Sequence, residues 1–379
     1  MLTRRSRRSF RVLVGVAVAA IAVSGLGACS SSTESLPGGA QPSNQINLAT
    51  VEPTDGVQPV VDFINSATNS IDMYMYEFDP TYKPIVSALQ NVQKRGVVVR
   101  LLLSRQLFGE PVNNHNVADQ KTLIKLGIPT QLSRPEFHDS HAKDISLDAG
   151  TSSQRVMVCD FNVGAGYFGV DPKPIFPGEG GTRGMSVIDT NEQDVNRINE
   201  TFNADWPPYG PWPAATQPNL VWGPSAAQYQ PPGNAVAALT SLINGAQNTL
   251  DIYVQALALP SQLYQPVLNR AKAGVKVRIV GNKGGINSQA LPTLKAAGVQ
   301  VVYGPKAIVD PSKFLYIHTK TIVVDAATSQ AVAFVGSENP FLDESINDER
   351  ELGAFVTTVN SVNAIEAVFN RDFSVSTPY

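Results

Sequence analysis

Apolar residues fall into short runs that are separated by stretches with helical spacing over most of the chain. The segments 70–74 and 249–253 each have the pattern of a β-strand that follows an apolar helical stretch. The segments 95–101 and 273–279 each read as the end of a helix, a glycine and then a buried strand. Because strands alternate with helices in this way, the pattern predicts an α/β sandwich.

The pattern occurs twice along the 379 residues. The matching segments are 70–74 with 249–253, 95–101 with 273–279, 126–128 with 297–299, and 202–205 with 369–372. A stretch rich in proline and aromatic residues, 207–233, separates the two series. We therefore predict two similar α/β halves, 49–206 and 234–379, joined by this linker.

The first 28 residues differ from the rest. Residues 1–11 hold five arginines and no acidic residue, and an apolar run over 12–23 follows that is too short to span a bilayer. The sequence Leu26-Gly27-Ala28-Cys29 then resembles the lipobox of bacterial lipoproteins. These features predict a signal peptide over 1–28, exported by either the general or the twin-arginine route. Cys29 becomes the lipidated first residue, which anchors the protein to the outer face of the cell membrane.

Residues 29–48 are rich in Ser, Gly, Pro and Asn, which is typical of a flexible tether. Without the signal peptide the chain keeps 24 basic and 32 acidic residues, so its net charge changes from −3 to −8. Nucleic-acid binders usually carry a basic face, so this balance argues against nucleic acid as a partner. Lipidation of Cys29 would leave Cys159 without an intramolecular partner, which excludes a disulfide framework.

One polar motif carries the candidate chemistry. The pattern H-x-K-x4-D, followed by an asparagine, occurs twice with every position offset by 177: His141, Lys143, Asp148 and Asn162, then His318, Lys320, Asp325 and Asn339. A matched pair that keeps register within a repeat is far rarer by chance than one short motif. We interpret the two aspartates as strand-end residues that hold the backbone of the motif.

The histidines and lysines suit a phosphodiester substrate. Alternate residues of a strand share a face, so each histidine points the same way as its lysine. The lysines can balance charge on the phosphate oxygens in the transition state, and the asparagines can donate further hydrogen bonds. One imidazole can form a phospho-histidine, while the other protonates the leaving alcohol and then activates water or an acceptor alcohol. This scheme needs no metal and no other cofactor.

The paired motifs, with Gly336-Ser337-Glu338-Asn339 after the second, resemble the phospholipase D superfamily over about residues 49–379. The resemblance implies a pseudo-dimer within a monomeric chain, with both motifs facing one cleft between the halves. It implies His141 as nucleophile, His318 as acid and base, and Ser337 in a supporting role. It also implies that Glu351 orients His141 from the opposite half. The equivalent first-half position falls near Thr182, which leaves His318 without an acidic partner.

The first half departs from the family pattern at Asp160, which stands where the second half has Ser337. A carboxylate facing the cleft would repel a phosphate. Asp160 avoids this repulsion if it turns away from the cleft, pairs with a lysine or forms part of a tuned substrate pocket. Otherwise the catalytic function of the first half is weakened. Asp160 puts turnover in more doubt than the fold.

Three functions fit these observations. The first is a phospholipase D-type enzyme that hydrolyses or transfers phospholipid head groups, because export and a lipid anchor hold the protein at a membrane surface. The second is an exported nuclease of the same superfamily, against which the acidic charge argues. The third is a catalytically weak lipoprotein that binds phosphate-bearing lipids or polymers, which Asp160 favours.

Overall fold

The structure is a computed structural model that describes residues 36–109, 114–169 and 178–379, all within one unit of the chain. The predicted signal peptide, Cys29 and the first part of the tether lie outside the described residues. Within the described part of the chain, no helix has both the length and the apolar character needed to cross a membrane.

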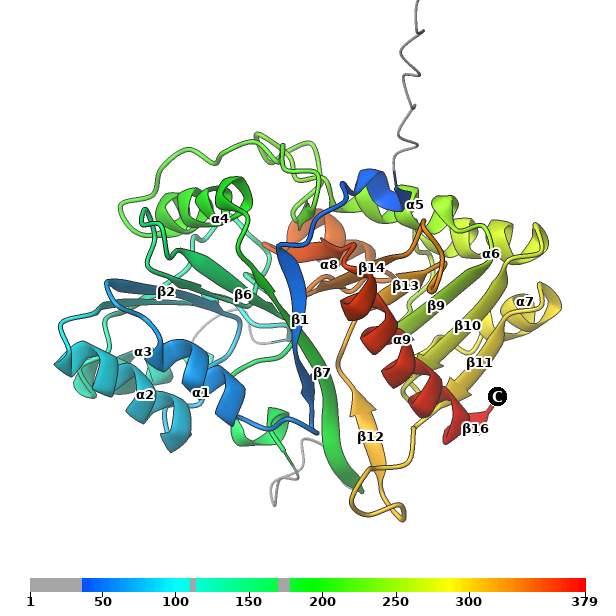
Figure 1. The fold of residues 1–379 in the computed structure, drawn as a ribbon, viewed down its shortest axis with the longest axis horizontal. Helices are drawn as coiled ribbons and strands as arrows, with labels where there is room; N and C mark the ends of the chain where they lie inside the picture. Colours follow the sequence, from blue (N-terminus) through cyan, green and yellow to red (C-terminus); the bar gives the residue numbers. More distant parts are fainter. Residues whose placement is uncertain (1–35, 110–113, 170–177) are drawn as a thin grey trace, which may run out of the picture. The chain divides into compact units, whose positions relative to one another are not determined.

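The first half forms a sheet in the order β1-β7-β6-β5-β2-β3-β4, in which β2, β3 and β4 run parallel (Figure 1). Its strands are β1 (Ile46–Glu52), β2 (Ser70–Met75), β3 (Val98–Leu103), β4 (Thr130–Leu132), β5 (Asp144–Leu147), β6 (Arg155–Cys159) and β7 (Glu179–Asp189). Its helices are α1 (Gln58–Asn65), α2 (Lys83–Lys94), α3 (His115–Lys125), η2 (Ala165–Tyr167) and α4 (Glu192–Asp205). The short helix η1 (Pro37–Gly39) precedes β1 but packs against the core of the second half.

The second half repeats this plan in the order β16-β11-β10-β9-β13-β14-β15-β8, in which β9, β10 and β11 run parallel. Its strands are β8 (Leu220–Trp222), β9 (Thr249–Val254), β10 (Lys276–Gly281), β11 (Gln300–Tyr303), β12 (Phe314–Ile317), β13 (Ile322–Val324), β14 (Val332–Gly336), β15 (Leu352–Val356) and β16 (Thr377–Pro378). Its helices are α5 (Ala235–Gly245), α6 (Tyr264–Lys272), α7 (Ala290–Ala296), α8 (Asp343–Asp348) and α9 (Val359–Ser374).

The predicted α/β class with two similar halves is confirmed, since each half contributes to one of two eight-stranded sheets. Strand β12 belongs to the second half in sequence but pairs with β7 of the first sheet, as Figure 1 shows near its centre. The proline-rich stretch 207–233 contains β8, which forms the edge of the second sheet. It is therefore more than a spacer between the halves.

The hydrophobic core has three parts. One lies between the first sheet and the helices α1–α3, and a second lies between the second sheet and α5–α7. The third contains residues from both sheets together with α4 and α9, so it is shared by the two halves. Because removal of apolar surface from water is the main force for folding, this shared core holds the halves together.

Two buried ion pairs link the halves in reciprocal fashion. Arg350, which precedes β15, lies 2.9 Å from Asp205 at the end of α4. Arg183 of β7 lies 2.7 Å from Asp372 of α9. Asp205 and Asp372 are the last residues of the repeated segments 202–205 and 369–372. All four side chains are nine-tenths or more buried, so each charge depends on its partner from the other half.

The backbone crosses between the halves at the same places. The Ala142 N–H donates to the Arg350 carbonyl at 2.7 Å, and the Thr319 N–H donates to the Arg183 carbonyl at 2.9 Å. The residue in the middle of each H-x-K motif is thus bonded to the arginine of the opposite half. The cross-half pairing therefore fixes where the two motifs lie.

We expect Asp372→Ala to lower the free energy of unfolding by about 3–5 kcal/mol, because it leaves the buried Arg183 guanidinium unpaired. Urea unfolding of the purified protein measures this change. Asp62→Ala, which removes an exposed carboxylate of α1, should stay within about 0.5 kcal/mol of the parent. Equal effects of the two substitutions would contradict the importance of the cross-half pair.

Candidate active site

The two H-x-K motifs lie at the start of equivalent strands. His141 and Lys143 lead into β5, and His318 and Lys320 lie between β12 and β13. Both lysines are fully buried, while the two histidines keep 9% and 5% of their surface exposed. Beyond the effect of burial, the charge of the lysine in the opposite motif lowers the pKa of each histidine. The structure thus brings the four predicted residues into one site between the halves.

His141 is held by a carboxylate of the other half. Its Nδ1 lies 2.9 Å and 3.0 Å from the two carboxylate oxygens of Glu351, as the sequence comparison implied. Glu351 also accepts hydrogen bonds from the hydroxyl groups of Ser337 and Ser345. A carboxylate that accepts a hydrogen bond from Nδ1–H keeps the proton on Nδ1 and the lone pair on Nε2, which is the tautomer that a nucleophile needs.

The charges of this pair are fixed by burial and by mutual attraction. Burial lowers the pKa of His141 to about 4, although Glu351 opposes this shift. Burial alone would raise the pKa of Glu351, but His141 and Lys143 lower it to about 2. Near neutral pH the site therefore contains an ionised Glu351 and a neutral His141.

His318 has different surroundings. Its Nδ1 lies 3.3 Å from the Lys320 ammonium, and its ring packs edge-on against Tyr167 with 5.2 Å between ring centroids. Burial, followed by the charges of Lys320 and Lys143, lowers its pKa well below the usual value. The free site therefore holds His318 in its neutral form.

The first-half counterpart of Glu351 is Gly184, and the position near Thr182 expected from sequence was wrong by two residues. Strand pairing places Cys159 opposite Ser186 and Gly336 opposite Gly353. Cys159 and Gly336 are equivalent positions of the repeat. Gly184 lies two residues before Ser186, and Glu351 lies two residues before Gly353, so Gly184 and Glu351 are equivalent as well. The Thr182 hydroxyl donates instead to Gly166 and Glu179.

Both lysines have weakened proton affinity. Burial lowers the pKa of Lys143 to about 8, with Glu351 opposing the shift. Burial and then the charge of Lys143 lower the pKa of Lys320 to about 7. A bound phosphate anion would stabilise the protonated form of each lysine, so binding of substrate and protonation are coupled.

The two asparagines each keep an unused acceptor. Asn162 donates to Glu77 and to the Tyr167 hydroxyl, and the Asn339 backbone N–H donates to Ser345 at 2.9 Å. The side-chain oxygen of each asparagine is buried without a hydrogen-bond partner among the described residues. Such groups near a site are suited to contact with a ligand or water.

The motif aspartates face away from this chemistry and toward the backbone. The Asp148 carboxylate accepts N–H groups of residues 68–70, just before and at the start of β2. Asp325 accepts the equivalent N–H groups of residues 247–249 at β9. Both residues have positive φ, near 56° and 50°, which aspartate tolerates better than most residues. The pair thus fixes the turn after each motif strand.

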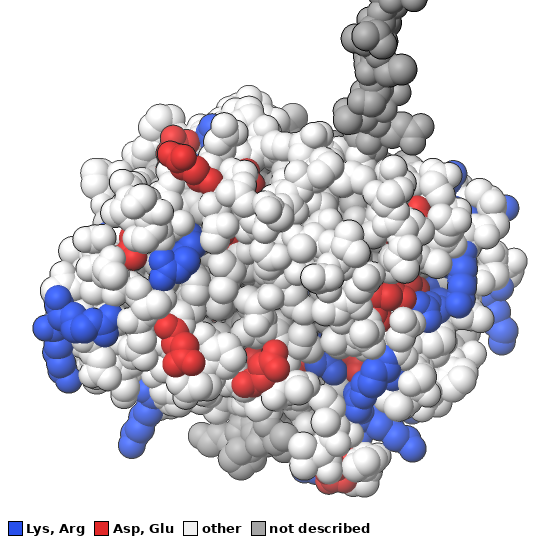
Figure 2. Space-filling model, viewed as in Figure 1, with Lys and Arg blue, Asp and Glu red and all other residues white. Residues whose placement is uncertain are grey.

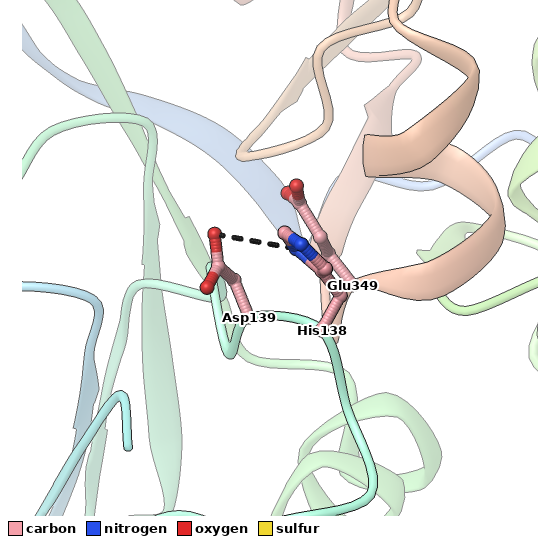
Figure 3. Close-up of side chains that lie close together, drawn as sticks. All are labelled: His138, Asp139 and Glu349. Atoms are coloured by element: carbon pink, nitrogen blue, oxygen red, sulfur yellow. Dashed lines mark ion pairs between the residues drawn. The ribbon is translucent and has the colours of Figure 1, made fainter. Parts of the chain in front are cut away.

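A further polar cluster lies beside the site. Figure 3 shows His138, Asp139 and Glu349, whose possible metal-binding atoms lie within 4.8 Å of one another. Burial raises the pKa of Asp139 to about 7 and that of Glu349 well above its usual value, and the charge of Glu351 adds to both shifts. The Glu349 carboxylate is 4.0 Å from the Nδ1 atom of His141. Near neutral pH Glu349 is therefore neutral and Asp139 is about half ionised, so the two acids add less charge beside Glu351 than two full carboxylates would.

Several residues of the site carried no sequence signal. Tyr76 packs edge-on against His141 at 4.7 Å between ring centroids and lies under the Lys143 ammonium, which favours a cation–π contact. Ser345 and Glu349 come from α8 and the residue after it, in a segment without a repeat partner in the first half. For Tyr76, the sequence showed no more than an aromatic residue shortly after the predicted strand at 70–74.

The fold and the paired sites define a phospholipase D-like protein. The family described as "Cardiolipin synthase, PLD-like domain" matches residues 60–206 and 239–373, so the chain belongs to this family. Members of the superfamily are phosphodiesterases and transferases. A search of curated proteins found no match.

Solved structures show the same fold at low sequence identity. Phosphatidylserine synthase of Haemophilus influenzae Rd KW20 superposes with a TM-score of 0.60 and 13% identity, over 91% of this chain and 88% of that one. Polyphosphate kinase of Porphyromonas gingivalis superposes with a TM-score of 0.61 and 14% identity, over 86% of this chain. The chain spans 46% of the length of that kinase, so the likeness covers less than half of it.

We expect the affinity for dimethyl phosphate, whose single charge does not change near neutral pH, to fall about tenfold or more between pH 6 and pH 9. The reason is that Lys320 and Lys143 lose their protons as pH rises through about 7 and 8. Isothermal titration calorimetry at each pH measures the fall. Lys94→Met, which removes an exposed lysine of α2, should leave the profile unchanged; a flat profile in the parent protein would contradict the expectation.

Proposed function

We propose that the protein cleaves or transfers the head groups of phospholipids through a phospho-histidine on His141. The observation that carries this proposal is the His141–Glu351 pair facing two buried lysines and a second histidine. This set provides a nucleophile, charge for the phosphate oxygens and an acid–base group in one water-poor site.

The reaction would proceed in two displacement steps. In the first, the Nε2 lone pair of His141 forms a bond to phosphorus, and the bond from phosphorus to the leaving alcohol breaks. A phosphate anion between the lysines offsets the positive charges that lower the pKa of His318, so His318 can hold the proton that it gives to the leaving oxygen. In the second, His318 takes a proton from water or an alcohol, which attacks phosphorus and frees His141.

An apolar pocket beside His318 supports a lipid substrate. A pocket of about 1090 Å³ is lined mainly by the segments that follow β9 and β10, by residues 377–379 and by the aromatic residues Phe314 and Tyr316. Phe314 and Tyr316 alternate along β12, so they share a face with His318, and the Tyr316 ring lies 6.3 Å from that of His318. Acyl chains of a lipid whose phosphate meets His318 could enter this pocket.

The surface charge favours a lipid over a polynucleotide. On the face seen in Figure 2, lysines and arginines form small separate groups among uncharged and acidic surface. Polynucleotide binding depends strongly on neutralisation of many phosphates, and the chain without its signal peptide has a net charge of −8. From the sequence we further propose that the protein is exported, anchored through a lipid on Cys29, and monomeric.

We expect the chain from residue 29 onward to release head groups from phosphatidylcholine vesicles in excess EDTA, and both His141→Ala and His318→Ala to lose at least about 10³-fold in rate. Head-group release and cleavage of single-stranded DNA should be measured side by side. A phosphatidyl group trapped on His141 in the His318→Ala protein would support the assigned roles. DNA cleavage that depends on both histidines would replace lipid by nucleic acid as substrate, and inactivity on both would favour a binding protein.

We expect Ser288→Trp, which places a large side chain in the apolar pocket, to lower kcat/KM for a long-chain phosphatidylcholine by about tenfold. Each methylene group that the tryptophan excludes from the pocket weakens binding by about fourfold. The rate on bis(p-nitrophenyl) phosphate, which has no acyl chain, should change less than about twofold. Ser329→Trp on an exposed turn outside the pocket serves as the matched control. Equal losses on both substrates would show that the pocket does not hold the chains.

A further inference from the structure

Each half has a carboxylate beside its motif, but the two carboxylates stand at different positions of the repeat. Gly184 is the counterpart of Glu351, and Asp160 is the counterpart of Ser337 at the repeat offset of 177. The second half therefore combines a serine after β14 with a glutamate before β15. The first half combines an aspartate after β6 with a glycine in β7.

The two arrangements exclude one another in the first half. A Cβ atom on Gly184 would lie 3.0 Å from the Asp160 Oδ1 atom and 2.9 Å from the Phe161 ring. Both distances are shorter than normal contacts, so a side chain at 184 and the carboxylate at 160 cannot share the space without movement. In the second half the short Ser337 side chain leaves room for Glu351 and donates a hydrogen bond to it.

Asp160 is buried among the cations of the site. Its side chain has no exposed surface, and its Oδ1 atom accepts the Met185 N–H at 2.9 Å. Its Oδ2 atom is buried without a hydrogen-bond partner among the described residues. Burial raises the pKa of Asp160 to about 6, and the charge of Lys320 is the strongest influence in the opposite direction. The carboxylate is therefore largely ionised at neutral pH and balances Lys320.

We propose that Asp160 is a positioning residue that supplies, from the first half, the buried negative charge that Glu351 supplies from the second, and so keeps Lys320 protonated for a phosphate group. This proposal rests on the proposed phosphodiester chemistry. On this view, Asp160 departs from the family pattern because the first half carries its carboxylate after β6, whereas the second half carries Glu351 before β15. The first half is thus complete rather than weakened.

The charges around Lys320 explain why the balance matters. The groups that face it are Lys143, His318, Asp160, Glu351 and Glu349. Burial and Lys143 both disfavour its protonated form, while Asp160 is the largest of the influences that favour it. Without that carboxylate, Lys320 would lose its proton at a lower pH, and the site would lose one of its two phosphate-binding cations.

The relocation also makes the two histidines unequal. Glu351 contacts the His141 ring directly, whereas no carboxylate contacts the His318 ring among the described residues. His141 therefore has a fixed tautomer and a partner for the positive charge that develops when it attacks phosphorus. This asymmetry supports His141 as the nucleophile.

The first test is Asp160→Asn, which keeps the acceptor for the Met185 N–H and removes the charge. We expect the pH at which dimethyl phosphate binding is half lost to move down by about one unit or more, with binding at pH 5 retained. Asp189→Asn, which replaces another fully buried carboxyl group at the end of β7, should not move this midpoint. An unchanged midpoint in a folded Asp160→Asn protein would overturn the proposal.

A second variant tests the relocation itself. Asp160→Ser alone should lower the midpoint, and Asp160→Ser/Gly184→Glu should restore it, because the pair then copies Ser337 and Glu351. A merely structural role for Asp160 would predict no such rescue in pH dependence. Failure of the double variant to move the midpoint back, while it folds, would contradict the exchange of positions.

A third measurement applies if Asp160→Asn does not fold. Lys320→Met leaves the Asp160 carboxylate unbalanced and removes the charge that lowers its pKa, so the melting temperature of this variant should fall as pH rises from about 4 to above 6. Asp160→Asn/Lys320→Met should be more stable than Lys320→Met, whereas additive losses would overturn the proposal. None of these measurements requires turnover. Inactivity on every substrate would therefore count against the proposed function and leave this inference standing.

Discussion

The reciprocal crossing of the two halves is the constraint on which the rest of the structure depends. Arg350 and Arg183 each place a guanidinium against an aspartate of the opposite half, and each also accepts a backbone N–H from the opposite motif. A buried charge without a partner costs several kcal/mol, so neither half can bury its arginine alone. The same contacts position the histidines, and the site therefore exists only when both halves are folded together.

Burial of two lysines in one site creates the second constraint. Two ammonium groups in a water-poor pocket repel each other, and both lose proton affinity as a result. The negative charges of Glu351 and Asp160 offset this repulsion. The free site is therefore close to neutral overall while its positive charges remain available to a phosphate. Such preorganised charge is the type of arrangement that stabilises a transition state without reorganisation.

Much of the fold followed from local pattern. Alternation of strand and helix spacing, glycine punctuation and the constant offset of 177 residues indicated two α/β halves and paired motifs. The partner of His141 was also accessible, because the resemblance to the phospholipase D superfamily implied Glu351. The first-half counterpart was misplaced at Thr182 because β7 is longer than β15 and its pairing register is set by β6, not by local spacing.

The sequence by itself determined the repeat, the identity of the motif residues and the excess of acidic charge, since these depend on residue type and spacing alone. Only the tertiary structure decided that Gly184 faces Asp160, that β12 joins the sheet of the other half, and that Ser345 supports Glu351. These contacts join segments far apart in the chain. Their register is chosen by packing and by the need to pair buried charges, which local sequence spacing does not encode.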